Sequence, residues 1–547
     1  MHSLEEVGQE ADAVRAEIEQ LYVRGIAASS AADRKKLAAL AEEWDRIGAG
    51  HVASRLLAAL RAADAGTSDA PRALLSAHTS LAVFERVLSL EAAVEAWAAH
   101  IEALRAAEGD EGEESEGDGD ESAAPEPEKP AEKPAAAAPP LEDPKGALAL
   151  VEELSRAVED LVRTGLTSAT ESTRAKLDAS FKEASRRKLL RLGASLRYVN
   201  EEVGRFLAHD EAFSIRRFSL FLHRSWLQAR GMAKGLRDKD DRLVASLVAS
   251  GGGAPRPVQS IEVVTVGVFK RTIVNVYTFD FKLRVVGAKD ADLAGRSLTY
   301  SLVFPRKTDG PARDLPAEAN LQLPQPQKFA PRVFCQGKTV KVTDAAVMLD
   351  ERGGRLVLGP KSTVTEGGPY TDWDPLFRFD PGLALGRVLR HRPGPLDLAA
   401  ETMEEVVVAE PALSAEPLRT SEGRRVFALS GAGGLVLDAV IPDNPYDKDG
   451  EETLKRLREG LRRSKRPLLY GLAYYEYGRT VFLPVSILHA AGAGESAPEP
   501  EAPKKKGAAA KAPKDEKKAA AKAAGGPELF TISDKKFDVS ALVGKLF

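Results

Sequence analysis

The triplet Gly-Lys-Thr at positions 337–339 matches the end of a phosphate-binding loop, in which the backbone amides of a glycine-rich turn hold phosphate groups. The first glycine of such a loop would stand at position 332, which is Arg332. The residues after the triplet alternate as a strand, whereas the loop must open into a helix. Residues 431–434 resemble a dinucleotide-binding turn, but Val436 stands where the third glycine is required. We therefore expect turns before strands at both places and no nucleotide site.

The densest cluster of carboxylates in a segment expected to fold lies at positions 443–452. If Gly450 is the sixth residue of a calcium-binding loop, Pro445 and Arg456 take the first and twelfth positions, so both end ligands are missing. Two interpretations stay open. The favoured one is that the acids cap a helix that starts near Glu451, where the helix dipole attracts negative charge. The other is an irregular metal site.

The histidines and the cysteine form no local pair that could bind a metal or attack a substrate. None of the eight histidines lies within four residues of another, and Cys335 is the single cysteine. Cys335 precedes an expected strand, so a small core residue is the favoured interpretation. We predict no cofactor, no metal and no catalytic residue. The remaining alternative is an enzyme whose site lies in a cleft between the two β modules described below.

Basic residues are better candidates for binding than for catalysis. One basic cluster lies in an expected helix and another near the C-terminus, and nucleic acid is a partner that such clusters attract. Aromatic residues between positions 213 and 226 could stack on bases, but their helical spacing favours a core under a solvated helix face. The candidate nucleic-acid contacts are Arg186, Arg187, Lys188, Lys504, Lys505, Lys506, Lys511, Lys514, Lys517, Lys518 and Lys522.

The overall composition indicates more about the architecture of the protein than about its partners. The chain has 547 residues, of which 43% are hydrophobic, so it is too long for one core and predicts several folded units. Its net charge of -4 selects no class of partner. A single cysteine excludes a disulfide framework and suits a reducing compartment, so we expect the cytoplasm. No signal peptide and no apolar run of about 18 residues is present, so we expect no membrane partner.

Two helical units are predicted before the strands begin. Residues 1–107 are rich in alanine, leucine, glutamate and arginine, with apolar residues at helical spacing and Pro71 as the single proline. Gly25 is placed to end the first helix. The pattern restarts over residues 146–254 as a copy shifted by 140 positions, in which Gly165 matches Gly25, Leu161 matches Leu21 and Arg174 matches Arg34. We predict two related helical bundles that pack on each other or on a partner.

From about residue 255 the apolar period changes from 3.6 to 2, which predicts strands with one wet face. The pattern G-R-x-V-x-x-P-x-S-x-[VL] starts at Gly354 and again at Gly478, 124 residues later. Its proline, Pro360 or Pro484, is expected to end ladder pairing at a sheet edge. We predict two related antiparallel β modules, small barrels or sandwiches, at 255–365 and 366–490, with a helix inserted near 451–464. The fold class is multidomain α+β.

Two segments have compositions that leave little to bury. We predict a disordered acidic linker at 108–145 and a disordered tail rich in lysine, alanine and proline at 491–527. Residues 528–547 turn apolar again, which predicts a docking segment that adds a strand to a sheet edge or lays a helical turn in a groove. The candidate docking residues are Leu529, Phe530, Ile532, Phe537, Val539, Leu542, Leu546 and Phe547.

Duplicated modules and a docking end favour a non-enzymatic cytoplasmic scaffold or accessory protein that binds other proteins. The alternative is a nucleic-acid-binding protein, whose barrel-like modules offer a groove and whose lysine tail makes nonspecific phosphate contacts. An aromatic content of 6% speaks against base stacking. The predicted partners are therefore other proteins, with nonspecific nucleic acid as a second partner of the tail and no membrane.

Overall fold

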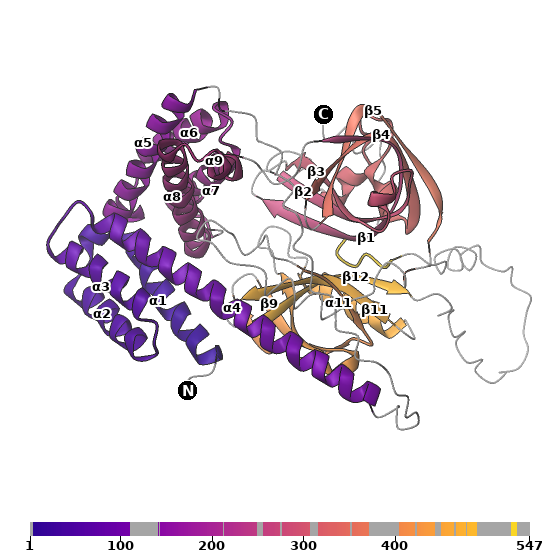
Figure 1. Ribbon diagram of the computed structural model, residues 1–547, viewed down its shortest axis with the longest axis horizontal. Coiled ribbons are helices and arrows are strands. Elements are labelled where there is room, and N and C mark those ends of the chain that lie inside the picture. Colours follow the sequence, from indigo (N-terminus) through magenta and orange to yellow (C-terminus); the bar gives the residue numbers. More distant parts are fainter. Residues whose placement is uncertain are drawn as a thin grey trace, which may run out of the picture.

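The computed structural model describes residues 4–109, 141, 143–211, 213–248, 255–273, 276–306, 316–350, 353–370, 373, 404–421, 424–442, 450–463, 467–476, 479–489 and 527–532. The predictions for most of the linker, for the lysine tail and for residues 533–547 lie outside these ranges. The described chain is a mixed α+β protein, as predicted, with helices first and then two sheets of five and seven strands (Figure 1).

The first helical unit comprises α1 (Leu4–Arg24), η1 (Ile26–Ala28), α2 (Ala31–Arg46), α3 (Gly50–Asp64) and the long α4 (Ala70–Gly109). Gly25 follows α1 with φ 87°, a conformation that a side chain would strain. Ser30 then starts α2 with a capping box. Its hydroxyl accepts the Asp33 amide at 3.1 Å, and the Asp33 carboxylate accepts the Ser30 amide at 2.9 Å.

The second helical unit comprises α5 (Pro144–Thr164), η2 (Leu166–Ser168), α6 (Glu171–Arg186), α7 (Leu190–Leu207), α8 (Ile215–Asp238) and α9 (Asp241–Val248). Asp143 caps α5 by accepting the Gly146 amide at 2.9 Å. Gly165 follows α5 with φ 80°. The bounds of η2 and α6 follow those of η1 and α2 by 140 residues each.

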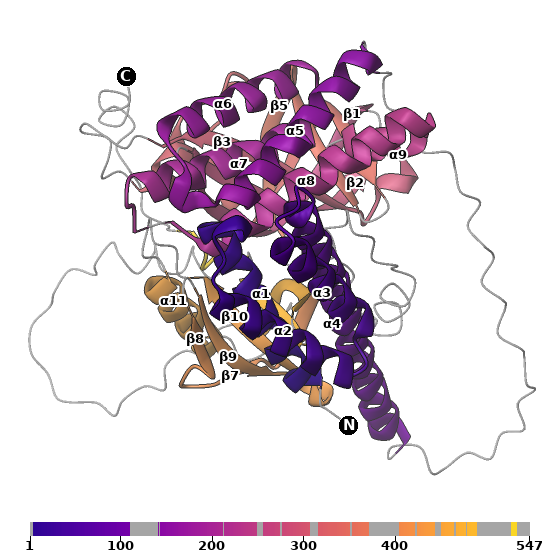
Figure 2. The same ribbon diagram turned by 90° about the vertical axis from the view of Figure 1, so that its left-hand side faces the viewer.

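The two helical units pack on each other around one shared core, and Figure 2 shows α5–α8 lying over α1–α3. The core joins Ile18 of α1 to Val158 of α5 and Leu74 of α4 to Leu222 of α8. Where α1 and α5 end, the backbones of Gly25 and Gly165 meet. A Cβ atom on Gly25 would stand 2.5 Å from the carbonyl carbon of Thr164, and one on Gly165 would overlap Arg24 and Gly25.

Replacing Gly165 by alanine is therefore expected to destabilise the helical pair by about 2–5 kcal/mol, from a positive φ and from overpacking against backbone that cannot move aside. Gly66→Ala is the matched control, because Gly66 also has a positive φ of 63° but has open space around it. The urea midpoint of the helical circular-dichroism signal measures both. Equal losses in the two variants would show that the close approach at Gly165 does not matter.

The first β unit comprises β1 (Arg256–Ile273), β2 (Val276–Ala288), β3 (Ser297–Pro305), β4 (Lys338–Asp350) and β5 (Gly353–Pro369), with the short helices η3 (Ala291–Leu293), η4 (Ala317–Gln322) and η5 (Pro331–Cys335). The strand path β1-β2-β3-β5-β4 closes because β4 also pairs with β1. Every pairing is antiparallel except that of β3 with β5, which consists of Thr299 opposite Arg355. Phe279, Phe281 and Phe334 fill the interior.

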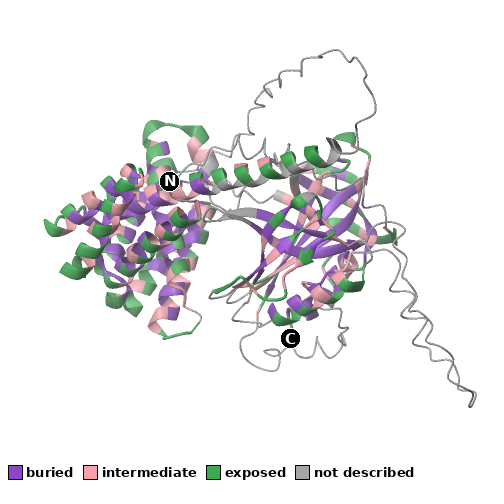
Figure 3. Ribbon diagram, turned by 90° about the horizontal axis from the view of Figure 1, so that it is seen from below, coloured by how far each residue is buried: buried purple, intermediate pink, exposed green. Residues whose placement is uncertain are grey.

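The second β unit comprises β6 (Glu404–Ala409), β7 (Ala412–Leu413), β8 (Arg419–Ser421), β9 (Arg424–Ser430), η8 (Ala432–Gly434), β10 (Val436–Pro442), α11 (Gly450–Arg463), β11 (Pro467–Glu476) and β12 (Arg479–His489). The sheet order is β6-β11-β12-β10-β9-β7, with β8 on β9, and β10 runs parallel to β12. Leu454 and Leu457 of α11 and Val94 of α4 pack into its core. Figure 3 shows the buried residues gathered inside the helical units and on the sheets.

Pro360 and Pro484 differ from the expectation that they end ladder pairing. Both lie within a strand, and both lie at a register shift. The shift in β4–β5 falls between Thr343 and Ala345 and leaves Pro360 outside the ladder. The shift in β11–β12 falls between Tyr470 and Gly471 and leaves out Val485, so Pro484, opposite Gly471, lies beside the unpaired residue. Because a bulge disrupts the ladder locally, it tolerates a proline, which cannot donate a hydrogen bond, at or beside the unpaired residue.

Candidate functional site at the junction of the two β units

The C-terminal segment, residues 527–532, lies in the junction between the two β units (the yellow trace in Figure 1). Its backbone forms an antiparallel bridge to β12, in which the Glu528 amide donates to Ile487 O at 2.8 Å and the Ile487 amide donates to Glu528 O at 3.1 Å. The ladder between β10 and β12 ends at Phe482, so this edge of β12 is open to the segment. A short strand added at a sheet edge is one of the two docking modes that the sequence suggests.

The side chains of the segment divide between the two cores. Leu529 and Ile532 pack into the core of the first β unit, and Phe530, only 2% exposed, packs into the core of the second. Thr531 donates from Oγ1 to Val268 O of β1 at 2.6 Å. Five consecutive residues therefore contact both units, so the segment joins them.

The two units also touch directly beside the segment. Val264 and Val266 of β1 share a small core with Tyr470 and Val485 of the second β unit. At Gly267 the approach is so close that a Cβ atom would stand 2.6 Å from Val485 Cγ1. The buried Ser486 hydroxyl donates to Val266 O. The contact is tight enough to fix how the two units are oriented.

A buried polar cluster completes the junction. Glu405 of β6 accepts hydrogen bonds from the Arg284 guanidinium of β2 and from Ser297 Oγ at 2.9 Å. Burial alone would raise the pKa of Glu405. The positive charge of Arg284 and its hydrogen bond to the carboxylate outweigh burial and hold the pKa of Glu405 below its ordinary value. Burial raises the pKa of Tyr470, and the charge of Glu405 raises it further. Burial lowers the pKa of Lys282, against the attraction of Glu405.

Buried, perturbed groups of this kind occur both in active sites and in structural ion pairs. Here the Glu405 carboxylate is already bound by Arg284 and Ser297, which come from the opposite unit. Removing one partner would leave a buried charge uncompensated, so the pair favours this one orientation of the units. We interpret the cluster as the polar part of the junction.

The predicted site residues lie in three places. Leu529, Phe530 and Ile532 meet in the junction. Arg186, Arg187 and Lys188 lie at the end of α6, and Glu183 binds Arg186 and Arg187, whose hydrogen bonds lower its pKa to about 2. The remaining candidates lie outside the described residues: Phe537, Val539, Leu542, Leu546, Phe547, Lys504, Lys505, Lys506, Lys511, Lys514, Lys517, Lys518 and Lys522.

The sequence does not mark Arg284 and Glu405 as partners, because they are 121 residues apart. One signal for Arg284 is its place in an alternating strand, on the face predicted to be wet. The same holds for Lys282 beside it. Two long charged side chains on that face must be hydrated or paired with an opposite charge, and the second β unit supplies that charge.

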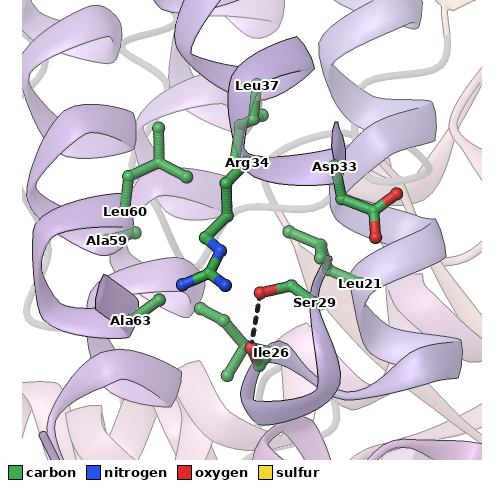
Figure 4. A pocket seen from close by; sticks show the side chains of 9 residues that line it. All are labelled: Leu21, Ile26, Ser29, Asp33, Arg34, Leu37, Ala59, Leu60 and Ala63. Atoms are coloured by element: carbon green, nitrogen blue, oxygen red, sulfur yellow. Dashed lines mark hydrogen bonds between the residues drawn. The ribbon is translucent and has the colours of Figure 1, made fainter. Parts of the chain in front are cut away.

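The other features of the described residues are weaker candidates for a functional site than the junction. A hollow in the first helical unit, lined by Leu21, Arg34, Leu60 and neighbours, has room for about one water molecule, and Ser29 at its rim donates to Ile26 O at 2.8 Å (Figure 4). Among the described residues, no group of three histidine, cysteine or acidic side chains is placed to hold a metal ion. No described helix combines the length and the apolar composition needed to cross a membrane.

No family model matches this chain, and no curated protein matches it. A structure described as structural mimicry for functional antagonism is 8% identical and covers 43% of this chain and 92% of its own, with a TM-score of 0.20. A murine DNA-binding protein bound to double-stranded DNA is 10% identical and covers 42% and 92%, with a TM-score of 0.17. A replication protein A heterotrimer bound to single-stranded DNA is 13% identical and covers 42% and 65%, with a TM-score of 0.11. Likenesses this weak decide neither fold nor function.

Proposed function

We propose that this chain is a non-enzymatic scaffold that binds other proteins, and that its C-terminal segment holds the β units in their binding arrangement. The proposal rests on one observation: Leu529 and Ile532 are buried in the core of the first β unit, whereas Phe530 is buried in the core of the second. Residues 490–526 tether the segment, so it can return to this seat after release. Burial of each apolar side chain stabilises the docked segment by about 1.5–3 kcal/mol, before the entropy lost on ordering the segment is subtracted. The net stabilisation is small enough for the segment to dock reversibly. The single cysteine is consistent with a cytoplasmic location.

We further propose that the two β units are duplicates. Taking β6, β9, β10, β11 and β12 as the first to fifth strands of the second unit, both units follow the path first-fourth-fifth-third-second. In both, the third and fifth strands form the parallel pair, and a helical segment lies between the third and fourth. This path is that of the oligonucleotide- and oligosaccharide-binding barrel, a likeness by analogy of strand order that leaves the ligand open.

The helical units support the same idea of duplicated modules. α4 and α8 begin 145 residues apart, and His78 and His223 stand 145 residues apart within them. These two imidazole rings stack at 4.1 Å between centroids. Gly25 meets Gly165 in the same way. Equivalent residues that touch each other are the mark of two copies related by an approximate two-fold axis.

Nucleic acid is the second candidate ligand, suggested by the eight lysines between positions 504 and 522. The position of the second β unit argues against nucleic acid. Its Glu405 pairs with Arg284 on the outer face of β2, so this arginine is already neutralised. Arg186 and Arg187 are likewise paired with Glu183. Phosphate contacts would therefore fall to the lysine tail, and such binding is steeply salt-dependent.

Affinity purification of the full chain from nuclease-treated host lysate in 0.5 M salt separates these candidates. A scaffold is expected to retain defined proteins in fixed proportion under both treatments, and to lose at least one of them when residues 528–547 are deleted. Recovery of nucleic acid alone, lost with nuclease or with salt, would contradict the scaffold and support the second candidate.

A further inference from the structure

The outward side chains of β2 and β3 form matched pairs beside the junction. In the β2–β3 ladder Arg284 stands opposite Ser297, and this pair holds the Glu405 carboxylate of the second β unit. Two residues along the same ladder, Lys282 stands opposite Thr299. Each pair consists of a cation on β2 and a hydroxyl on β3. The second pair therefore offers the same chemistry that binds a carboxylate in the first.

Arg355 of β5 extends the second pair onto a third strand. It stands opposite Thr299 in the parallel pairing of β3 with β5. Its neighbour Leu356 is buried in the core of the first β unit, so Arg355 lies on the outer face, where it is exposed. Lys282, Thr299 and Arg355 thus form one outward row across three strands, which we call the donor row.

The cations of the donor row keep N–H groups available to a ligand. The Lys282 ammonium has three N–H groups, of which one donates to Thr299 Oγ1 at 3.1 Å. The ammonium also lies 6.0 Å from the centre of the Phe269 ring, which is a cation–π contact. Among the described residues, no carboxylate forms an ion pair with Lys282 or with Arg355.

The two carboxylates that attract Lys282 are already bound by other groups. Asp280 accepts hydrogen bonds from Arg271 and from Ser301, the latter at 2.5 Å. Glu405 is held by the first pair. Burial lowers the pKa of Lys282 although both carboxylates attract its charge. A further carboxylate at the donor row would compensate that charge.

The donor row is closed at one end and open at the other. Gly267 of β1 stands opposite Lys282, and a Cβ atom on Gly267 would stand 2.6 Å from Val485 Cγ1 of the second β unit. Arg355, at the other end, is exposed. An incoming side chain can therefore reach the row from the β5 side, with the second β unit as the wall behind it.

We propose that the donor row, Lys282, Thr299 and Arg355, binds carboxylates of an acidic segment of a partner protein. This inference rests on the proposed protein-binding function and names the chemistry of one partner. A carboxylate is favoured because the neighbouring pair of the same two strands already holds one. A single-stranded nucleic acid fits less well, because the aromatic residues of β3, Tyr300 and Phe304, are buried in the core and offer no stacking surface.

The test uses a fluorescein-labelled hexaglutamate peptide, titrated with the full-length chain at about 50 mM salt and followed by anisotropy. We expect a dissociation constant of about 0.1 mM, and at least about tenfold weaker binding of a hexaglutamine peptide. Arg355→Gln and Lys282→Gln should each weaken the binding of hexaglutamate at least about fivefold, because each removes a charge-assisted hydrogen bond. Arg355 is exposed, so its variant keeps the fold, and circular dichroism checks this.

Lys361→Gln is the matched control, because Lys361 is an exposed lysine of the same strand as Arg355 but lies outside the donor row. It removes one positive charge and should change the affinity by less than about twofold. Equal weakening by Lys361→Gln and Arg355→Gln, no binding of hexaglutamate, or tighter binding of an oligothymidylate that depends on the same two cations would each overturn the inference. The co-purification experiment reports on the scaffold separately, since other surfaces can retain a partner when the donor row is empty.

Discussion

Replacing Phe530 by aspartate is expected to release residues 527–532 from the junction and to lower the unfolding temperature of the β units by at least about 5 °C. The Phe530 side chain is 2% exposed in an apolar core, where an unpaired carboxylate costs several kcal/mol. Releasing the segment costs less free energy than burying that carboxylate, so we expect the segment to leave the core. Loss of one large buried side chain is worth about 3–5 kcal/mol, and 1 kcal/mol corresponds to about 4–8 °C in a unit of this size.

Scanning calorimetry measures the loss, and faster hydrogen exchange at the Glu528 amide reports the release. Leu418→Asp is the matched control, since Leu418 is an exposed leucine of the second β unit, and it should change neither result. If Phe530→Asp left the calorimetric trace as it is in the unaltered chain, the segment would contribute nothing to the junction.

Acid is expected to unfold the helical pair through His78 and His223. The rings stack at 4.1 Å, Tyr22 Oη lies 3.0 Å from His78 Nδ1, and Thr79 Oγ1 lies 2.9 Å from His223 Nε2. Burial lowers the pKa of His223 to about 3. Burial lowers the pKa of His78 as well, and repulsion from Arg15 and from His223 in its protonated form lowers it further. Both rings are therefore neutral in the folded protein at neutral pH.

The sign of the effect follows from proton binding. In the unfolded chain both histidines gain a proton below about pH 6.5, whereas in the folded chain His223 gains one near pH 3. The unfolded state thus binds more protons between these values, so stability is full above about pH 6.5 and falls as the pH drops toward 3. The slope is about 1.4 kcal/mol per pH unit for each histidine.

Urea midpoints of the helical circular-dichroism signal, taken from pH 7 to pH 4, measure this slope. His223→Gln keeps a polar group near Thr79 and should remove about half of the slope. His51→Gln, at an exposed histidine of α3, should leave it unchanged. A urea midpoint that does not move between pH 7 and pH 4 in the unaltered protein would show that the pair carries no such cost.

Local patterns in the sequence predict much of this structure. Alternation predicts strands where β2 and β3 form, and Gly25 and Gly165 stand where α1 and α5 end. The apolar residues Leu529, Phe530 and Ile532 stand out because nothing near them in sequence could cover them. Each of these signals lies within about ten residues, the range over which period and turn chemistry act.

The contacts that join distant segments could not be predicted in the same way. His78 and His223 look isolated in the sequence, yet they stack because the two helical units pack on each other around one shared core. Arg284 and Glu405 are paired across a junction that no local pattern marks. The bulges that accommodate Pro360 and Pro484 depend on the opposite strands, so each proline alone suggests a strand end.

Hydrogen exchange at the Glu528 amide, in the full-length chain at neutral pH, reports whether the C-terminal segment holds the two β units together. This amide donates to Ile487 O at 2.8 Å, and the bond exists when the segment is seated between the two β units. We expect slow exchange at Glu528, at least tenfold slower than in the same peptide free in solution, and unprotected exchange after Phe530→Asp. Exchange at the free-peptide rate in the unaltered chain would contradict it, because the C-terminal segment would then not hold the two units together.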